Sequence, residues 1–320
     1  MKFFYYLNRL LLNMVPSFIF QRRKNQLERL FEKDKQAIQA RVDYYCKPNE
    51  RHELPSDATT QYSYRRRGKS AYFYDLKQYL HYFPKHLKFA YYFGDHVRVE
   101  SQPTLYKARP TQGDNSTSVL FKLDKMRHFR FVDDNIDYAD KKDMVVFRGA
   151  VRQKHRIRFM QAMFGHPLVD AGQSNPSNEH PEWQQPFMSV NDQLQYKFIV
   201  CLEGNDVASN LKWVMSSNSI AITPKMKFET WFMEGSLKPG VHYIEVKEDW
   251  SDFEEKVNDY LQNPDKAEKI LKNAHEHVAQ FQNKDMEDLV CIKTLEKYFA
   301  VTNGGKEGPR RDRWSGSESA

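Results

Sequence analysis

The sequence predicts an α/β protein built from two halves that face a central cleft. Between residues 144 and 282, short apolar runs alternate with helical patterns, which is typical of a parallel sheet covered by helices. A comparable apolar run at 87–93 ends in Gly94 and Asp95 and indicates a second such half. The length of 320 residues, of which 40% are apolar, is enough for about two domains.

The N-terminal segment, residues 3–20, is aromatic and aliphatic but is interrupted by polar residues and by Pro16. A membrane-spanning helix needs about 20 mostly apolar residues. A secretory signal is not expected, because no small-residue cleavage site follows. Two interpretations stay open: a core helix, or a helix that lies on an anionic membrane. The bases available to lipid in the second case are Arg9, Arg22, Arg23 and Lys24.

The elements expected before residue 144 follow from apolar spacing. Leu27, Leu30 and Phe31 recur at helical spacing and predict a charged helix over 24–45. The other elements expected here are a turn-rich stretch at 47–70, a short helix at 72–82 closed by Pro84, a strand at 87–93 and a polar loop at 111–118.

The second half contains the alternating pattern, with a Pro-rich polar loop at 171–187. The strands expected are 144–147, 196–202, 219–223 and 241–246, and the helices are 153–164, 208–215, 251–261 and 264–282. The sequence therefore predicts four parts. They are an N-terminal domain at 1–142, a C-terminal domain at 143–282, a helix at 283–302 that packs back on the N-terminal domain, and a disordered tail at 303–320.

The charge and cysteine content limit the partners and the compartment. The net charge is +7 and the pI is about 9.0, which favours an anionic partner. No nucleic-acid-binding module is recognisable, so no nucleic acid partner is expected. Cys46, Cys201 and Cys291 are too few and too far apart for a disulfide framework, and a reducing, cytoplasmic location is predicted.

Several kinds of chemistry lack their motifs. The sequence contains no Gly-x-x-x-x-Gly-Lys-Ser/Thr, no Gly-x-Gly-x-x-Gly and no Gly-x-Ser-x-Gly. His275 and His277 are two residues apart, which on a helix points them to different faces. No Asp-x-Asp occurs either. The sequence therefore predicts no metal site and no bound cofactor.

The ends of the predicted strands are the candidate binding positions, because ligands of parallel sheets bind beyond the carboxyl ends of the strands. Gly149 lets the backbone approach a ligand closely, and a helix start follows it. The bases that suit a diphosphate here are Arg148, Arg152, Lys154 and Arg156. The alternative is a basic surface helix with a turn glycine.

A second strand end lies at Gly204, followed by the small residues Ala208 and Ser209. Lys212 falls in the first turns of the next helix, within reach of a phosphate, unless it extends into solvent. Glu229 could accept hydrogen bonds from sugar hydroxyls, or could be a helix-start carboxylate. Asp95 is a candidate general base, or a turn residue.

A set of motifs in this sequence, taken together, resembles glycosyltransferase family 90. The motifs are Val146-Phe-Arg-Gly149, Tyr196-Lys-Phe198, Glu203-Gly204 with Ala208-Ser209, Leu211-Lys-Trp213, Glu229-Thr-Trp-Phe-Met-Glu-Gly235, Leu237-Lys-Pro239 and His242-Tyr-Ile244. The similarity spans about residues 87–300 and is greatest to the bacterial lipopolysaccharide enzymes of the family.

This resemblance implies a GT-B fold, in which two Rossmann-like domains face a cleft and the C-terminal one holds the nucleotide-sugar donor. It implies a metal-independent, inverting transfer of a hexose from a UDP-sugar to lipopolysaccharide or a related carbohydrate. The N-terminal domain is then the acceptor side. The alternatives are a protein O-glycosyltransferase and a membrane-associated protein that binds nucleotide sugars without catalysis.

By position, Arg156 corresponds to the donor-phosphate arginine of the family and Asp95 to the proposed base of its animal branch. The segment from Gly204 onward corresponds to the donor loop. The sequence departs from the animal enzymes at Ala150 and Val151, where they have Ser and Arg, and at Asn210, where they have Arg.

Overall fold

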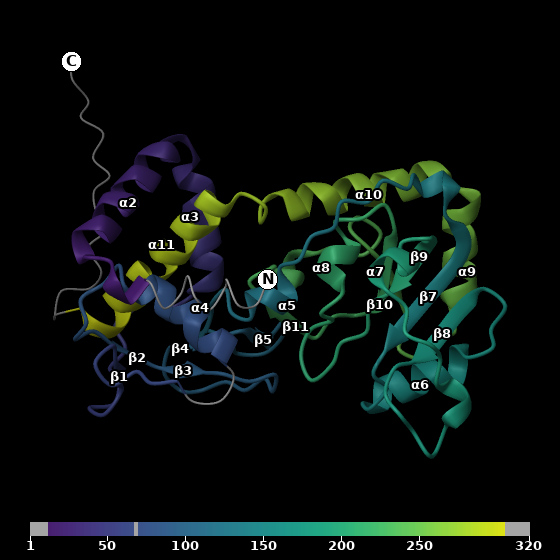
Figure 1. Cartoon of the computed structure of the whole chain (residues 1–320), viewed down its shortest axis with the longest axis horizontal. Helices are drawn as coiled ribbons and strands as arrows, with labels where there is room; N and C mark the ends of the chain where they lie inside the picture. The colour runs from purple at the N-terminus through teal and green to yellow at the C-terminus, as the bar shows by residue number, and fades with distance from the viewer. Residues whose placement is uncertain (1–11, 67–69, 305–320) are drawn as a thin grey trace. The chain divides into compact units, whose positions relative to one another are not determined.

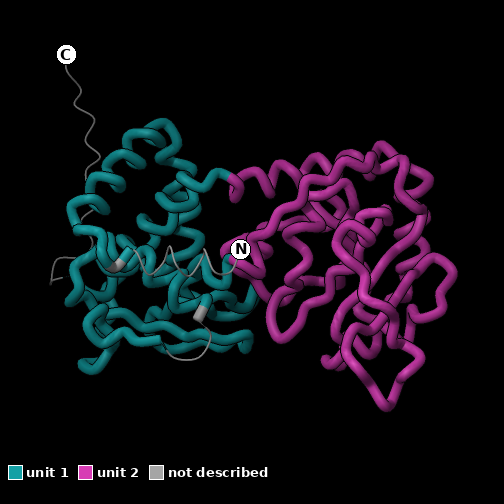
Figure 2. The backbone as a smooth tube through the Cα atoms, in the orientation of Figure 1, with its two compact units in different colours: residues 1–125, 283–320 teal, residues 126–282 magenta. Residues whose placement is uncertain are grey.

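The computed structural model describes residues 12–66 and 70–304, and the chain divides into two compact units (Figure 2). Unit 1 comprises residues 1–125 and 283–320, and unit 2 comprises residues 126–282. Both contain helices and parallel strands, so the predicted α/β class is confirmed. Residues 1–11, which include half of the predicted N-terminal segment, and 305–320, most of the predicted tail, lie outside the described residues.

Unit 2 begins at Met126, whereas the sequence predicted a boundary before residue 143. The segment that precedes the first strand is fixed inside unit 2 by Asp134. Its Oδ2 atom accepts hydrogen bonds from Lys141 Nζ at 2.8 Å and from the Asn218 amide at 2.8 Å. The contact with Asn218 joins positions 84 residues apart, which no local pattern reveals.

The centre of unit 2 is a five-stranded parallel sheet with the order β12-β10-β9-β7-β8. Its strands are β7 (Lys142–Gly149), β8 (Val169–Gln173), β9 (Tyr196–Val200), β10 (Ile220–Pro224) and β12 (Ile244–Val246). The first strand, β7, has β8 on one side and β9 on the other. The topological switch point, where ligands of such sheets bind, therefore lies between the carboxyl ends of β7 and β9.

One face of this sheet carries a hydrophobic cluster that includes side chains of α6, α9 and α10, and apolar side chains of the other face, such as Val146 and Ile199, are buried as well (the elements are labelled in Figure 1). Val145 and Phe147 of β7 point to this face, where they meet Phe159 and Met160 of α6. The helices are α6 (Lys154–Met163), α7 (Val190–Gln193), α8 (Leu211–Val214), α9 (Phe253–Gln262) and α10 (Pro264–Ala279), with 3-10 turns at Tyr138–Asp140, Pro181–Trp183 and Glu234–Ser236. The short strand β11 (Phe228–Thr230) was not predicted.

Two expectations for unit 2 were wrong in detail. The first three residues of the predicted loop at 171–187 belong to β8. This strand was missed because it contains the polar residues Asp170 and Gln173 and so lacks an apolar run. The predicted strand at 241–246 begins only at Ile244, because Gly240 has a φ of 70° and turns the chain. The amides of Val241 and His242 then donate to the Lys238 carbonyl rather than to a neighbouring strand.

Unit 1 contains shorter strands than unit 2. The strands β3, β4 and β6 form a parallel sheet, and β1 pairs antiparallel with β2. The strands are β1 (Thr59–Thr60), β2 (Lys88–Phe89), β3 (Tyr91–Tyr92), β4 (Thr104–Tyr106), β5 (Ala108–Pro110) and β6 (Ser118–Leu120). No helix separates β3 from β4 or β4 from β6 within the described residues 91–120, so unit 1 differs from the regular Rossmann-like half that was expected.

The predicted strand at 87–93 is split at Ala90 into β2 and β3. Tyr298 causes this break, because its hydroxyl accepts a hydrogen bond from the Ala90 amide at 2.8 Å. The predicted helix at 24–45 is also split, by a 3-10 turn at Glu32–Asp34. The helices of unit 1 are α2 (Ser17–Leu30), α3 (Lys35–Tyr45), α4 (Ser70–Leu80) and α11 (Lys284–Asn303), with a 3-10 turn at Leu12–Met14, and α5 (Lys125–His128) leads into unit 2.

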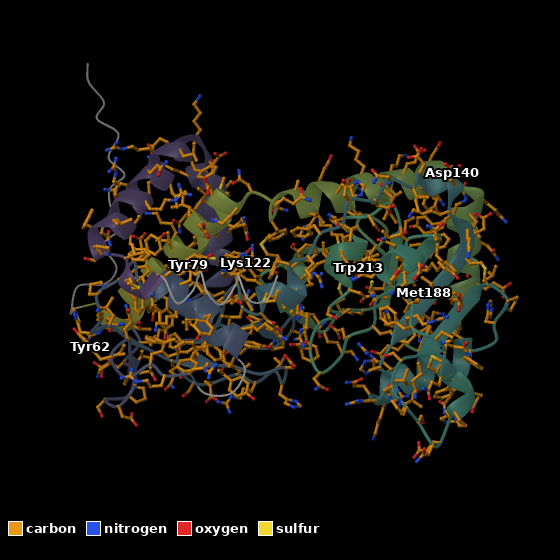
Figure 3. The ribbon with its side chains drawn as sticks, viewed as in Figure 1. Tyr62, Tyr79, Lys122, Asp140, Met188 and Trp213 are labelled. Atoms are coloured by element: carbon orange, nitrogen blue, oxygen red, sulfur yellow. The ribbon has the colours of Figure 1, made fainter. Side chains whose placement is uncertain are left out.

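The C-terminal helix α11 packs on α2, α3, α4 and β2 and so belongs to unit 1. Tyr79 and Lys122, labelled in Figure 3, contact Asp288 and Glu287 of this helix, at 2.8 Å and 2.6 Å. Eleven of its side chains are buried, so α11 forms the centre of unit 1. Across residues 12–66 and 70–304, every helix is too short or too polar to reach across a lipid bilayer.

Candidate active site

The Arg156 guanidinium joins the two sides of the switch point in unit 2. Arg156 lies in the first turn of α6, directly after the β7 end. One terminal nitrogen donates to the Ala150 carbonyl at 2.7 Å, on the β7 side. On the β9 side, the other donates to the Leu202 carbonyl at 2.7 Å and Nε donates to the Glu203 carbonyl at 2.9 Å. The strand ends predicted as candidate sites are therefore held together by this one side chain.

No acidic side chain of the described residues neutralises the charge of Arg156. Burial lowers the pKa of its guanidinium from the ordinary arginine value. Among residues 12–66 and 70–304, no carboxylate forms an ion pair with it. Arg156 is partly buried, and withdrawing a charge from water without a counter-ion costs free energy. The arrangement is therefore suited to an anion supplied from outside the chain.

Gly149 and Gly204 flank the guanidinium of Arg156. A Cβ atom on Gly149 would lie 3.8 Å from one terminal nitrogen, and a Cβ atom on Gly204 would lie 3.7 Å from the other. Neither glycine has the positive φ that favours glycine for conformational reasons. At Gly204 the added atom would meet nothing but Arg156. The missing side chain of Gly204 thus leaves room for a ligand to approach the cation, whereas at Gly149 the Phe147 ring already lies 3.1 Å from the position of a Cβ atom.

The loop after β9 is attached to both the sheet and α6. The side-chain amide of Asn210 donates to the Val200 carbonyl at 3.0 Å, and the side-chain amide of Gln153 donates to Asn205 Oδ1 at 3.1 Å. Ala208 is buried in this loop, whereas Ser209 is exposed. Only Ser209 of the two predicted small residues presents its side chain to solvent.

Arg148 lies away from this cluster. The period of two along a strand points it to the face opposite Phe147 and Gly149. Its guanidinium donates to Asp170 Oδ1 at 2.7 Å and to the Asp170 carbonyl at 2.9 Å. The sequence-based prediction that Arg148 adds charge to the diphosphate site therefore needs correction, since its contacts are those of a structural ion pair between β7 and β8.

Lys212 is likewise paired inside the protein. Its ammonium contacts Glu234 Oε1 at 2.6 Å, and both side chains are completely buried. The same carboxylate accepts hydrogen bonds from the Thr230 amide at 2.6 Å and the Thr230 hydroxyl at 2.9 Å. Lys212 therefore fixes the chain around residues 230–234 and does not extend toward a phosphate, contrary to the prediction.

Glu229 is buried in β11, and both of its neighbours are anchored. Thr230 is held by Glu234, as described above. On the other side, Glu203 Oε1 accepts hydrogen bonds from the amides of Lys227 and Phe228, each at 3.0 Å. The backbone that carries Glu229 is thus fixed at both ends.

Glu203 is a site residue that sequence reasoning used only as part of a motif. Its carboxyl group anchors the segment before β11, while its backbone carbonyl accepts from Arg156 and from His155 Nε2 at 2.7 Å. Burial raises the pKa of Glu203 to about 7, although the two amide hydrogen bonds act in the opposite direction. A carboxylate that immediately precedes a strand-end glycine was the available signal.

Asp95 follows the β3 end in unit 1. Its Oδ1 atom accepts a hydrogen bond from the Tyr72 hydroxyl at 2.7 Å and contacts the Lys107 ammonium at 2.8 Å. Lys107 directly follows β4, so both charged groups lie at the carboxyl ends of parallel strands. Asp95 retains partial exposure, with 22% of its side chain accessible, whereas Lys107 is buried. Lys107 was missed because the three-residue strand before it was not predicted.

The described residues provide no group of three or more His, Cys, Asp or Glu side chains that could hold a metal ion. His275 and His277 contact different carbonyl groups, those of Ser217 and Phe232, each at 2.8 Å.

A parallel α/β unit with a cationic side chain at its switch point that has no acidic partner among the described residues is typical of enzymes that bind phosphorylated nucleotides. Residues 120–301 match glycosyltransferase family 90. The chain is 39% identical to the O-glucosyltransferase LpsA of Dichelobacter nodosus over 290 aligned residues. The aligned region covers 89% of this chain and 91% of that protein.

More distant similarity extends to animal enzymes. Human protein O-glucosyltransferase 3 is 27% identical over 141 residues, which cover 42% of this chain and 27% of that protein. The mouse protein of the same name is 26% identical over 140 residues, covering 42% of this chain and 28% of that protein. The chain belongs to glycosyltransferase family 90 and is a glycosyltransferase.

Proposed function

We propose that this enzyme transfers a hexose from a UDP-sugar, with inversion at the anomeric carbon, to an inner-core sugar of lipopolysaccharide or a related carbohydrate. The observation that carries the donor assignment is Arg156, a partly buried guanidinium at the switch point that has carbonyl partners but, among the described residues, no carboxylate. The diphosphate of a UDP-sugar would supply the missing negative charge, through charge-assisted hydrogen bonds of the strongest kind found in proteins.

In the proposed reaction, Asp95 removes the proton of the acceptor hydroxyl as its oxygen attacks the anomeric carbon. The bond between that carbon and the UDP oxygen breaks, and UDP leaves with the electron pair. Arg156 and the first-turn amides of α6 stabilise the charge that develops on the leaving diphosphate. The contacts of Tyr72 and Lys107 with Asp95 fix the orientation of the base.

We assign the donor to unit 2 and the base to unit 1, in a GT-B organisation. Gly149, Gly204 and Ser209 contact the donor, and Glu229 accepts from its hydroxyl groups. Leaving-group stabilisation by Arg156 takes the place of a metal ion, so no cofactor is proposed. The relative from Dichelobacter nodosus is an O-glucosyltransferase, which makes UDP-glucose the first donor to test.

The acceptor and the location are also proposals. A net charge of +7 suits phosphorylated inner-core sugars, and we place the enzyme in the cytoplasm, in peripheral contact with an anionic membrane. Transfer to protein is the second candidate acceptor class. It is favoured by the similarity to protein O-glucosyltransferases, but that similarity covers 42% of the chain, against 89% for the bacterial relative.

The donor assignment is tested by titrating UDP into wild-type enzyme and the Arg156→Ala variant. Loss of a hydrogen bond to a charged group should weaken UDP binding by about 1.5–3 kcal/mol. Arg158→Ala, exposed on the same helix, is the matched control and should bind like wild type. Equal affinity of the two variants would reject the donor site.

The acceptor assignment is tested by mass spectrometry of lipopolysaccharide from cells with and without the gene. A hexose missing from the core oligosaccharide supports the proposal. Intact lipopolysaccharide, together with UDP binding by the pure protein, would point to donor binding without this transfer. Hexose on a protein acceptor would move the enzyme to the second acceptor class.

A further inference from the structure

The outward side of α2 is unusual for a surface helix. Its inward side carries Phe20 and Leu27, which are buried. At 100° per residue, the opposite side is occupied by Phe18, Arg22 and Arg29. All three are exposed, and 66% of Phe18 is accessible to solvent. An aromatic side chain and two cations thus share a side of the helix where polar side chains are the rule.

Further apolar side chains surround this face. Met14, Ile19 and Leu30 are exposed by 80%, 44% and 58%. Together with Phe18 they make four large apolar groups within one short stretch of chain. Single exposed apolar residues are common on protein surfaces, so it is the concentration of four of them in residues 14–30, next to the bases, that indicates an interaction site.

The bases of α2 fall into two groups. Arg23 and Lys24, which the sequence suggested as lipid contacts, instead form ion pairs with Asp285 and Glu296 of α11. Arg22 and Arg29 form no ion pair with any residue in 12–66 or 70–304.

The acidic charge of this region is also accounted for. The single acidic residue of α2, Glu28, is paired with Lys293. The outward face of the helix therefore carries positive charge without a carboxylate.

We propose that the outward face of α2, formed by Phe18, Arg22 and Arg29 and flanked by Met14, Ile19 and Leu30, docks on the surface of an anionic phospholipid bilayer. Guanidinium groups would contact lipid phosphates, while the apolar side chains enter the boundary between headgroups and acyl chains. The chain that leads into this face, residues 1–11, contains two bases and no acid in its sequence, and two Phe, two Tyr and three Leu.

The chosen occupant is lipid because this face offers bases and apolar groups together, and no acid. A protein partner recognised by shape would not require that charge pattern. The proposal identifies the part of the protein that would make the peripheral membrane contact proposed above. It is independent of the sugar transfer, because none of these residues belongs to the donor or base positions.

The test is sedimentation of the full-length protein with vesicles of phosphatidylcholine, with and without about one-third phosphatidylglycerol. Binding is expected only with the anionic lipid, and Arg22→Ala with Arg29→Ala should weaken it by about tenfold or more. The matched control, Lys269→Ala with Lys272→Ala, removes two exposed bases from α10 in unit 2 and should bind like wild type.

The apolar part of the face is tested by Phe18→Ser with Ile19→Ser, which should reduce vesicle binding even at high salt. Phe187→Ser is the control, since 88% of Phe187 is exposed in unit 2. Melting temperatures should not change, because all substituted side chains are exposed.

Equal binding by the face variants and their controls would overturn the proposal. So would a change of oligomeric state in light scattering without lipid, which would identify the face as a protein contact. A measurement of UDP affinity distinguishes a failure of this proposal from a failure of the proposed function, because the affinity should remain at the wild-type value in every face variant.

Discussion

Glu203 couples the switch point to pH. The pKa of its carboxyl is about 7 in the folded protein, against 4.5 for an ordinary glutamate. Between these values the folded state binds more protons than the unfolded state, so the contribution of Glu203 to stability is complete below about pH 4.5 and is lost as the pH rises to about 7. The difference between these two pKa values corresponds to a free energy of about 3 kcal/mol.

Glu203→Gln should abolish this part of the pH dependence, because the amide does not titrate. We expect urea unfolding between pH 5 and pH 8 to show a loss of stability in wild type that the variant lacks. Glu268→Gln, at an exposed position of α10, serves as the control and should follow wild type. Parallel profiles for Glu203→Gln and wild type would contradict the assignment.

Asp95→Asn tests the base. The amide keeps the shape and accepts from Tyr72, but it cannot take a proton, so turnover should fall by about 10²–10⁴-fold. UDP affinity should persist. A modest drop in melting temperature is expected, because buried Lys107 loses its carboxylate partner. Asp114→Asn on an exposed loop is the control, and turnover within a few-fold of wild type for both variants would place the base elsewhere.

The limits of sequence reasoning at this scale are visible in the cations. Gly149, Gly204 and Arg156, which the sequence placed at strand ends, lie close together in the structure, because β7 and β9 are neighbours in the sheet and end at the same edge. Arg148 and Lys212 occupy similar sequence positions, but their acidic partners, Asp170 and Glu234, come from other parts of the chain. Charge alone does not indicate whether a base is already paired.

At the scale of elements, α11 is held in unit 1 by a buried carboxylate. Glu287 contacts Arg41 at 2.5 Å and Lys122 at 2.6 Å, and its side chain is 4% exposed. Because Glu287→Ala leaves two largely buried cations without this carboxylate, it should destabilise the protein by about 3–5 kcal/mol in urea unfolding.

The control for Glu287 is Asp285→Ala on the same helix. Its ion pair with Arg23 is partly exposed, so the loss should stay below about 1 kcal/mol. Similar losses of unfolding free energy in the two variants would show that the buried ion pairs of Glu287 stabilise the protein no more than the partly exposed one of Asp285.

The elements recovered from the sequence are those with enough residues to form a pattern. The strands at β7, β9 and β10 were found because each contains a run of buried apolar residues. In unit 1 the strands have two or three residues and are defined by tertiary contacts, such as that of Tyr298 with Ala90. Periodicity cannot register elements so short.

At the scale of the whole molecule, the chemistry of the chain predicts independence from divalent metals. The described residues offer no cluster of three metal-binding side chains, and the proposed leaving-group partner is an arginine. Turnover should therefore survive dialysis against EDTA. Loss of turnover on chelation, restored by a divalent ion, would contradict the proposed mechanism.

The discontinuity of unit 1 affects the order in which the protein is made. Unit 2 is a single stretch of chain and is complete at Gln282, whereas unit 1 still lacks α11 at that moment. About 180 residues separate Lys125 from Asn303, which a ribosome adds in roughly 10–35 s. During this interval the surfaces that α11 covers are exposed on the nascent chain. The unit translated first is thus the last to finish folding, and chaperones have their longest access to it.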